Sequence, residues 1–235
     1  MKTNTTVTMR FPFALLAAVA SLVFAPAILQ AEESADSPLA MVTGAAESLQ
    51  ARLGGKKDYY ETNAAELYTL VDELLLPRFD TLYAGKLVLG KQHWTAASEE
   101  QRVRFVDTFY NFLVRTYAKG ILEFDQDKLT VLPDVRYSAD RGKALVRTSL
   151  EISNGEKVQV NYSVRRVENN WKIYDVRIEG VSYIQNYRNQ FDAEINARGI
   201  DSVINRLEEE AKKAEAANAA APAQENRTAG TSQET

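Results

Sequence analysis

Residues 171–191 read WKIYDVRIEGVSYIQNYRNQF, and this stretch decides the fold. Up to Gly180 apolar and polar side chains alternate, which is typical of a half-buried strand. After Gly180 apolar residues recur at helical spacing, at Ile184, Tyr187, Phe191 and Ile195. A strand with one apolar face and a helix with one apolar stripe, joined by a short corner, fold toward the same interior. That interior is either a filled core or a cavity for an apolar ligand.

The preceding residues extend this strand into an antiparallel sheet of four expected strands. The first of them, over 129–137, contains Pro133 and is therefore confined to an edge or a bulge. A three-residue loop at 153–155 pairs Leu150 with Val158 and puts Gly155 at the left-handed position that such loops need. A loop at 168–170 pairs Val160 with Ile178, Tyr162 with Val176 and Val164 with Tyr174. The sheet then has one apolar face and one polar face, so we expect helices on one side only. Asp175 and Glu179 fall on the polar face and are interpreted as surface cross-strand pairs.

Helices are expected before and after the sheet. Ser37-Pro38 begins the first, and capping boxes at Asn63 with Glu66 and Ser98 with Gln101 begin two others. A helix over 79–89 is closed by Gly90. The helix after Ser98 carries phenylalanines 105, 109 and 112 on one stripe, a heavy aromatic load for a core alone. A short helix follows Gly199, and residues 211–235 are expected to form a disordered tail.

The first 31 residues have the pattern of a secretory signal peptide. Lys2 and Arg10 precede an uncharged apolar run, which small residues follow. We expect cleavage after Ala31, with Ala27 as a second possible position; a permanent anchor is the alternative. Cleavage leaves a domain over 32–210, and no later apolar run reaches the length of a membrane span. The absence of cysteine in an exported chain means that stability comes from the core alone.

Charge and chemistry exclude several function classes. The net charge of −4 becomes −6 without the two cations of the signal peptide, which argues against a nucleic-acid partner. His93 is the only histidine and cysteine is absent, so neither a zinc cluster nor a thiolate nucleophile is available. No phosphate-cradling or dinucleotide-binding glycine pattern occurs. We therefore expect no enzyme, no metal and no cofactor.

Three blocks together resemble the MlaC family, also called the toluene-tolerance family, of periplasmic phospholipid-binding proteins. They are TLYAGKLVLGKQHW (81–94), SEEQRVRFVDTFYNFLVRTYA (98–118) and residues 171–191 quoted above. The resemblance covers roughly residues 63–207, in order. The chain has Phe79-Asp80-Thr81 where family members often carry Asp-Phe, so a local packing difference is expected there.

The resemblance implies an α+β fold in which helices pack on one face of a twisted antiparallel four-stranded sheet and enclose a deep apolar pocket. It implies a glycerophospholipid ligand and a periplasmic location. Its implied partners are an outer-membrane lipoprotein–porin complex and an inner-membrane ABC lipid transporter with its periplasmic lipid-binding subunit. The implied role is lipid shuttling that maintains the lipid asymmetry of the outer membrane.

Ten apolar or aromatic residues on the expected inward faces are the predicted lining of that pocket: Phe105, Phe109, Phe112, Tyr117, Val160, Tyr162, Tyr174, Val176, Ile184 and Tyr187. Each of them is alternatively an ordinary core residue. Two other functions stay open at this point. A cone-shaped isomerase-like enzyme would need a buried acid, and a non-catalytic envelope docking module would have a filled core.

Overall fold

The computed structural model describes residues 36–123, 128–151 and 155–220. The expected signal peptide, its cleavage positions and the end of the expected tail lie outside this range. Among the described residues, no helix combines the length and the apolar character that crossing a membrane requires.

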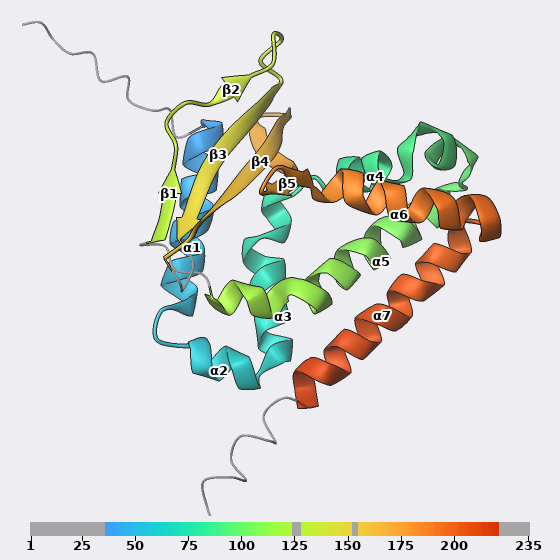
Figure 1. The fold of residues 1–235 in the computed structure, drawn as a ribbon, viewed down its shortest axis with the longest axis horizontal. Helices are drawn as coiled ribbons and strands as arrows, with labels where there is room; N and C mark the ends of the chain where they lie inside the picture. Colours follow the sequence, from blue (N-terminus) through green and yellow to red (C-terminus); the bar gives the residue numbers. More distant parts are fainter. Residues whose placement is uncertain (1–35, 124–127, 152–154, 221–235) are drawn as a thin grey trace, which may run out of the picture. The chain divides into compact units, whose positions relative to one another are not determined.

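Helices precede and follow a central run of strands (Figure 1). The helices before the sheet are α1 (Pro38–Leu53), α2 (Lys57–Thr62), α3 (Ala64–Leu74), η1 (Leu76–Arg78), α4 (Thr81–Ala96), α5 (Glu99–Tyr117) and η2 (Ala118–Glu123). The strands are β1 (Leu129–Val131), β2 (Arg136–Tyr137), β3 (Lys143–Glu151), β4 (Lys157–Val167), β5 (Asn170–Ile178) and β6 (Val181–Ser182). The last two helices are α6 (Tyr183–Arg198) and α7 (Ile200–Ala220).

The caps of two helices follow the sequence prediction and that of a third does not. The Ser37 hydroxyl accepts a hydrogen bond from the Ala40 N–H at 2.9 Å, and Ser98 with Gln101 forms the predicted capping box of α5. At Asn63 the predicted box is wrong. Its side-chain amide donates to the Tyr59 carbonyl at 2.8 Å, so it serves the end of α2 and not the start of α3.

Gly90 interrupts α4 as predicted, but the helix resumes beyond it. Its backbone, at φ 69° and ψ 169°, lies in a region that only glycine adopts without strain. Close to this kink, the Arg188 guanidinium of α6 donates to the Leu87 carbonyl, with Nε at 2.6 Å. A side chain of α6 is thus hydrogen-bonded to the backbone of α4.

Gly90→Ala is expected to lower the free energy of unfolding by about 1–3 kcal/mol, because alanine is strained at this φ and ψ. Chemical denaturation measures the loss. The matched control is Gly44→Ala within α1, where an added Cβ meets open space and where alanine is expected to stabilise the helix by up to about 1 kcal/mol. Equal effects at the two positions would contradict the strained backbone at Gly90.

The sheet is antiparallel, in the order β1-β3-β4-β5-β6, with β2 also paired to β3. The predicted register between β3 and β4 is confirmed: Leu150 is opposite Val158 and Glu151 is opposite Lys157. Gly155 has φ +83°, the left-handed conformation expected there. The rest of that loop, residues 152–154, lies outside the described residues.

A β-bulge between Ser163 and Val164 changes the register of the next pair of strands. Val160 is opposite Ile178 and Tyr162 is opposite Val176, as predicted, but Val164 is opposite Ile173 and not Tyr174. The loop is also one residue shorter than predicted, since Val167 pairs with Asn170. Because the extra residue reverses the alternation, Trp171 and Ile173 join the apolar face and are buried.

In the described part of the chain the sheet has six strands and not the expected four. The expected strand over 129–137 is split into β1 and β2, and Pro133, which cannot donate a ladder hydrogen bond, lies between them. Beyond β5, the turn at Glu179-Gly180, both at positive φ, forms a small hairpin with β6 before α6 begins. The α+β class with an antiparallel sheet is as predicted.

Buried apolar side chains form three separate clusters among the described residues. The first joins α4, α5, α6 and α7, and the second joins α1, α2, α3 and the end of α5. The third lies between α1 and the apolar face of the sheet, around Val146, Val164 and Ile173. In the view of Figure 1, α1 lies behind β3 and β4.

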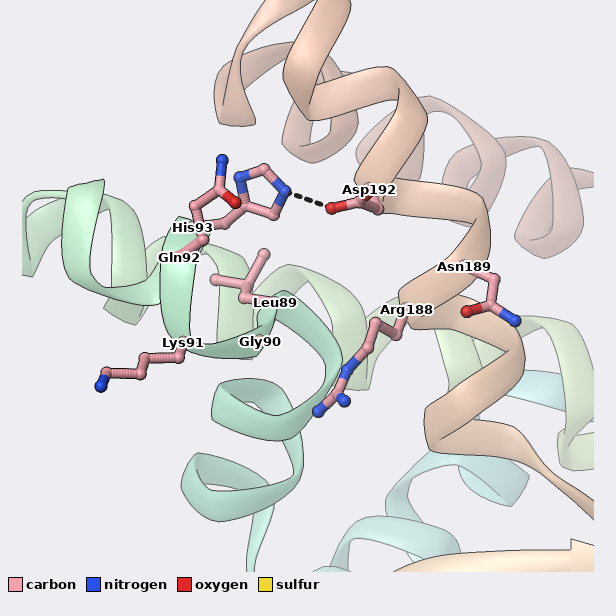
Figure 2. Close-up of a pocket in the computed structure, with 8 residues that line it drawn as sticks. All are labelled: Leu89, Gly90, Lys91, Gln92, His93, Arg188, Asn189 and Asp192. Atoms are coloured by element: carbon pink, nitrogen blue, oxygen red, sulfur yellow. Dashed lines mark hydrogen bonds and ion pairs between the residues drawn. The ribbon is translucent and has the colours of Figure 1, made fainter.

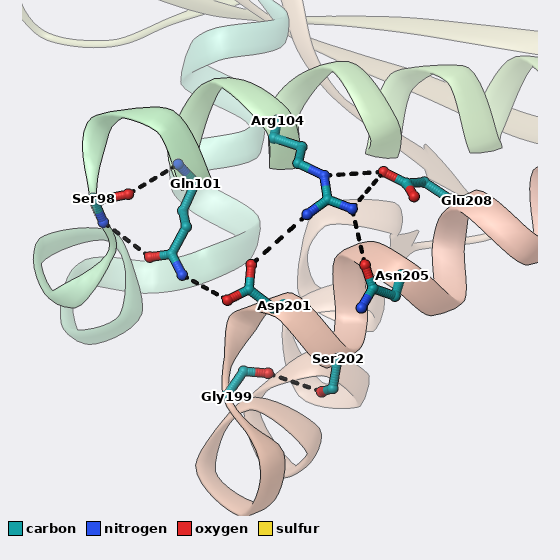
Figure 3. A network of polar contacts seen from close by, with 8 residues as sticks. All are labelled: Ser98, Gln101, Arg104, Gly199, Asp201, Ser202, Asn205 and Glu208. Carbon is teal, nitrogen blue, oxygen red and sulfur yellow. Dashed lines mark hydrogen bonds and ion pairs between the residues drawn. The ribbon is translucent and has the colours of Figure 1, made fainter.

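The final helix is much longer than expected. α7 runs to Ala220, so residues 211–220 of the expected tail are helical. Ala211 is buried, and Asn218 donates to both the Tyr68 hydroxyl and the Arg115 carbonyl at 2.9 Å. Figure 3 shows α7 joined to α5 through Arg104, which donates to Asn205 at 2.8 Å and pairs with Glu208 at 2.9 Å.

Candidate functional site

Four of the ten predicted pocket residues lie inside the helical core. Phe105, Phe109, Phe112 and Tyr187 are all buried in the cluster formed by α4 to α7. Their rings are in mutual contact: Phe105 stacks on Phe109 at 5.7 Å between centroids, and Phe109 meets Tyr187 edge to face at 5.0 Å. These rings therefore fill one another's space, which is the arrangement of a packed core.

Three predicted residues lie together on the apolar face of the sheet. Val160, Tyr162 and Val176 are half-buried, and the latter two border the cluster beneath α1. Burial nevertheless raises the pKa of the Tyr162 hydroxyl. These three side chains therefore keep part of their surface accessible on the apolar face of the sheet.

Two further predicted residues lie where α5 ends and α6 begins. Ile184 is half-buried at the edge of the helical core, and Tyr117 is 46% exposed. The Tyr117 and Tyr187 hydroxyls are 2.9 Å apart and hydrogen-bonded. Burial, reinforced by this hydrogen bond, raises the pKa of Tyr187. Tyr117 thus ties the end of α5 to α6.

Tyr174 lies on the other face of the sheet, contrary to the predicted register. The bulge directs it toward α4, where its ring meets Tyr83 edge to face at 5.3 Å, with Lys143 above both rings. The structure therefore brings the sheet residues Val160, Tyr162 and Val176 together, leaves the phenylalanines in a separate core and removes Tyr174 from the group.

Asp175 has a structural role beside the candidate site that sequence reasoning missed. It lies opposite Ser163 as predicted, but it is 6% exposed and not a surface residue. Its carboxylate accepts hydrogen bonds from the Ser182 hydroxyl at 2.8 Å and the Ile184 N–H at 3.2 Å, at the start of α6. Arg177 pairs with the same carboxylate at 3.3 Å. Asp175 therefore fixes α6 to the strand that carries Val176.

Asp175→Ala is expected to lower the free energy of unfolding by about 2–4 kcal/mol, because the half-buried Ser182 and Ile184 donors lose their acceptor. Urea denaturation checks this value. Asp107→Ala removes an equal charge from an exposed position on α5 and is expected to change stability by less than about 0.5 kcal/mol. A loss at Asp175 no larger than in this control would rule out the anchoring role.

Two small pockets among the described residues contain none of the ten predicted residues. The larger, of about 350 Å³, lies beside the kink of α4 and is lined largely by polar groups (Figure 2). There the buried His93 pairs with Asp192 at 2.7 Å across α4 and α6. The second pocket, of about 260 Å³, lies beside the start of α1. The described residues contain no group of three potential metal-ligating side chains.

The fold defines the class of protein first: it is an α+β protein with helices packed against an antiparallel sheet. Apolar side chains on the sheet and on the helices remain half-buried. The profile of the MlaC protein family matches residues 44–209. The chain belongs to the MlaC family.

Individual relatives agree with this assignment. The toluene tolerance protein ttg2D of Pseudomonas putida is 28% identical over 187 residues, which cover 78% of this chain and 86% of that protein. The intermembrane phospholipid transport system binding protein MlaC of Haemophilus influenzae is 26% identical over 180 residues, or 75% and 83% of the two chains.

A solved structure is similar over most of its length. It is the phospholipid-binding protein of Ralstonia solanacearum in complex with a phospholipid, with a TM-score of 0.67 and 30% identity. The similarity covers 75% of this chain and 97% of that one.

Proposed function

We propose that this protein is a periplasmic phospholipid carrier that holds the acyl chains of a glycerophospholipid between the apolar face of the sheet and the helices. The observation that carries the proposal is the separation of the buried clusters. A filled interior would join the apolar sheet face to the helical cores, whereas here half-buried apolar side chains remain on both. They are Val160, Tyr162 and Val176 on the sheet, and, at the edges of the helical clusters, Leu74 and Leu75 at the end of α3 and Tyr110 and Leu113 on α5.

Half-buried apolar side chains of this kind suit contact with acyl chains. Burying each methylene stabilises by about 0.8 kcal/mol, so one chain contributes on the order of 10 kcal/mol relative to water. Most of this free energy only offsets the cost of extracting the acyl chain from a bilayer, where it was already shielded from water. Binding then depends mainly on apolar surface and little on headgroup contacts. The phospholipid in the Ralstonia relative and the name of the Haemophilus relative support this ligand class.

The proposed partners follow from the family. The carrier exchanges lipid with an outer-membrane lipoprotein–porin complex and with an inner-membrane ABC lipid transporter through its periplasmic lipid-binding subunit. This exchange maintains the lipid asymmetry of the outer membrane. The signal peptide expected from the sequence supports the periplasmic location.

The isomerase-like alternative needs a free buried acid beside the apolar lining. Asp175 is the buried carboxylate of the described residues, but Ser182, Ile184 and Arg177 already engage it. It also faces the opposite side of the sheet from Tyr162, because its cross-strand neighbour is Ser163. We therefore propose a carrier that catalyses no reaction.

Organic extraction of the purified mature protein, followed by mass spectrometry, tests the proposal. Glycerophospholipid that stays with the protein through gel filtration in a fixed molar ratio is the expected result. A protein free of lipid that unfolds in one sharp transition would contradict it and favour a docking module with a filled core.

A further inference from the structure

Three cations lie directly opposite one another on three neighbouring strands. Lys143 of β3 is opposite Arg165 of β4, and Arg165 is opposite Lys172 of β5. All three belong to the face turned away from α1, since their neighbours Ala144, Val164 and Ile173 are buried on the α1 side. Like charges directly opposite in a sheet are destabilising. We call this row the cation ladder.

The ladder is only partly neutralised. Arg165 pairs with Asp80 at 2.6 Å, and the other oxygen of this carboxylate accepts the Tyr83 N–H at the start of α4. Lys172 donates to the uncharged Pro77 carbonyl at 3.1 Å. Neither lysine of the ladder has an ion pair with a carboxylate of the described residues. The Asp140 carboxylate also interacts electrostatically with Lys143. Three positive charges thus face two negative charges, Asp80 and Asp140.

Tyrosine rings hold the ladder in place from one side. Arg165 lies 4.4 Å from the centre of the Tyr83 ring, and Lys143 lies over the Tyr83 and Tyr174 rings and donates to the Tyr83 hydroxyl at 3.0 Å. This hydrogen bond raises the pKa of Lys143, so its ammonium stays charged at neutral pH. Lys143 is exposed, so the ammonium has room for a further acceptor.

We propose that the cation ladder docks the protein on the phosphate headgroups of an anionic bilayer. The ladder runs across a sheet face and is not enclosed in a pocket, which suits an extended surface of negative charge. Leu82, which directly precedes Tyr83 on α4, is 58% exposed, and exposed apolar side chains combined with basic residues are typical of segments at a membrane interface. The mature chain is acidic overall, so the attraction is local and acts within about 10 Å at moderate salt.

Cosedimentation of the mature protein with vesicles tests the docking surface. Vesicles of phosphatidylglycerol with phosphatidylcholine are expected to bind it, and vesicles of phosphatidylcholine alone are not. The double variant Lys143→Gln with Lys172→Gln is expected to bind about thirtyfold more weakly, since each lysine near an anionic surface contributes roughly fivefold. Arg165 is kept because its pair with Asp80 supports the fold.

The matched control removes the same charge elsewhere: Lys212→Gln with Lys213→Gln, both exposed on α7, is expected to bind like the wild type. The proposal would be overturned if the wild type and the ladder variant bound the vesicles equally, or if the control lost as much binding as the ladder variant. Binding to polyglutamate without binding to vesicles would also overturn it. So would complete release by millimolar inorganic phosphate at constant ionic strength, which would indicate a site for the free anion. Thermal melting of both variants verifies that they fold. The docking proposal does not depend on the proposed phospholipid cargo. Organic extraction measures the bound lipid separately, so the failure of one proposal can be distinguished from the failure of the other.

Discussion

Val160→Gln is expected to reduce the phospholipid that copurifies with the protein by at least about fivefold while the fold persists. Val160 is half-buried on the apolar face of the sheet, two residues before Tyr162 on the same strand. A glutamine amide placed among acyl chains has no hydrogen-bonding partner there, which costs about 1–3 kcal/mol in the loaded state. In the empty state of the proposed cavity the amide contacts water. Phosphate analysis of the extracted lipid per mole of folded protein measures the change.

The neighbouring residue provides the control for this substitution. Asn161 is on the same strand and faces the opposite side of the sheet, opposite Arg147 and Arg177. Asn161→Gln therefore introduces the same side chain outside the cavity, and its lipid content is expected to match the wild type. A full lipid load in Val160→Gln would remove Val160 from the cavity wall.

Phe105→Ala is expected to destabilise the protein by about 3–5 kcal/mol without emptying it of lipid. Phe105 is fully buried, stacked on Phe109 and in edge contact with Phe191 at 6.1 Å. Removing this ring leaves a void that neighbouring rings fill only in part. For a chain of this size the loss corresponds to a fall in Tm of roughly 10 °C. Thermal unfolding and lipid analysis of the folded protein are the two readouts.

Val103→Ala serves as the control on the same helix. Val103 is 55% exposed, so its truncation is expected to change stability by less than about 0.5 kcal/mol. If Phe105→Ala instead kept the wild-type stability and lost its lipid, Phe105 would line the lipid cavity, as the sequence predicted. It would then not belong to the packed helical core.

The pairing of β3 with β4 could be predicted because alternation and loop length both constrain it. Only one loop length puts Leu150 opposite Val158 and so keeps the apolar residues on one face. The bulge beside Ser163 has no such signal. Tyr174 and Ile173 are both acceptable on an apolar face, so the alternation alone did not indicate which of them points inward.

The helical stripe of phenylalanines indicated which side of α5 faces inward, but not what lies opposite. The structure puts α6 and α7 there, and α7 was expected to be short. Residues 211–220 are rich in alanine and have little apolar periodicity, so their helix has to be recognised from tertiary contacts such as those of Asn218. Asp175 was missed for a related reason: an acid on a strand resembles a surface residue until the start of a helix covers it.

Paramagnetic NMR with a phospholipid that carries a nitroxide on its acyl chain tests the central proposal most directly. A bound chain between sheet and helices is expected to broaden the signals of Val160, Tyr162 and Val176, while Phe105 and Phe191 in the helical core are affected much less. Broadening that is strongest at those two phenylalanines, or no broadening beyond that from free lipid, would contradict a cavity against the sheet.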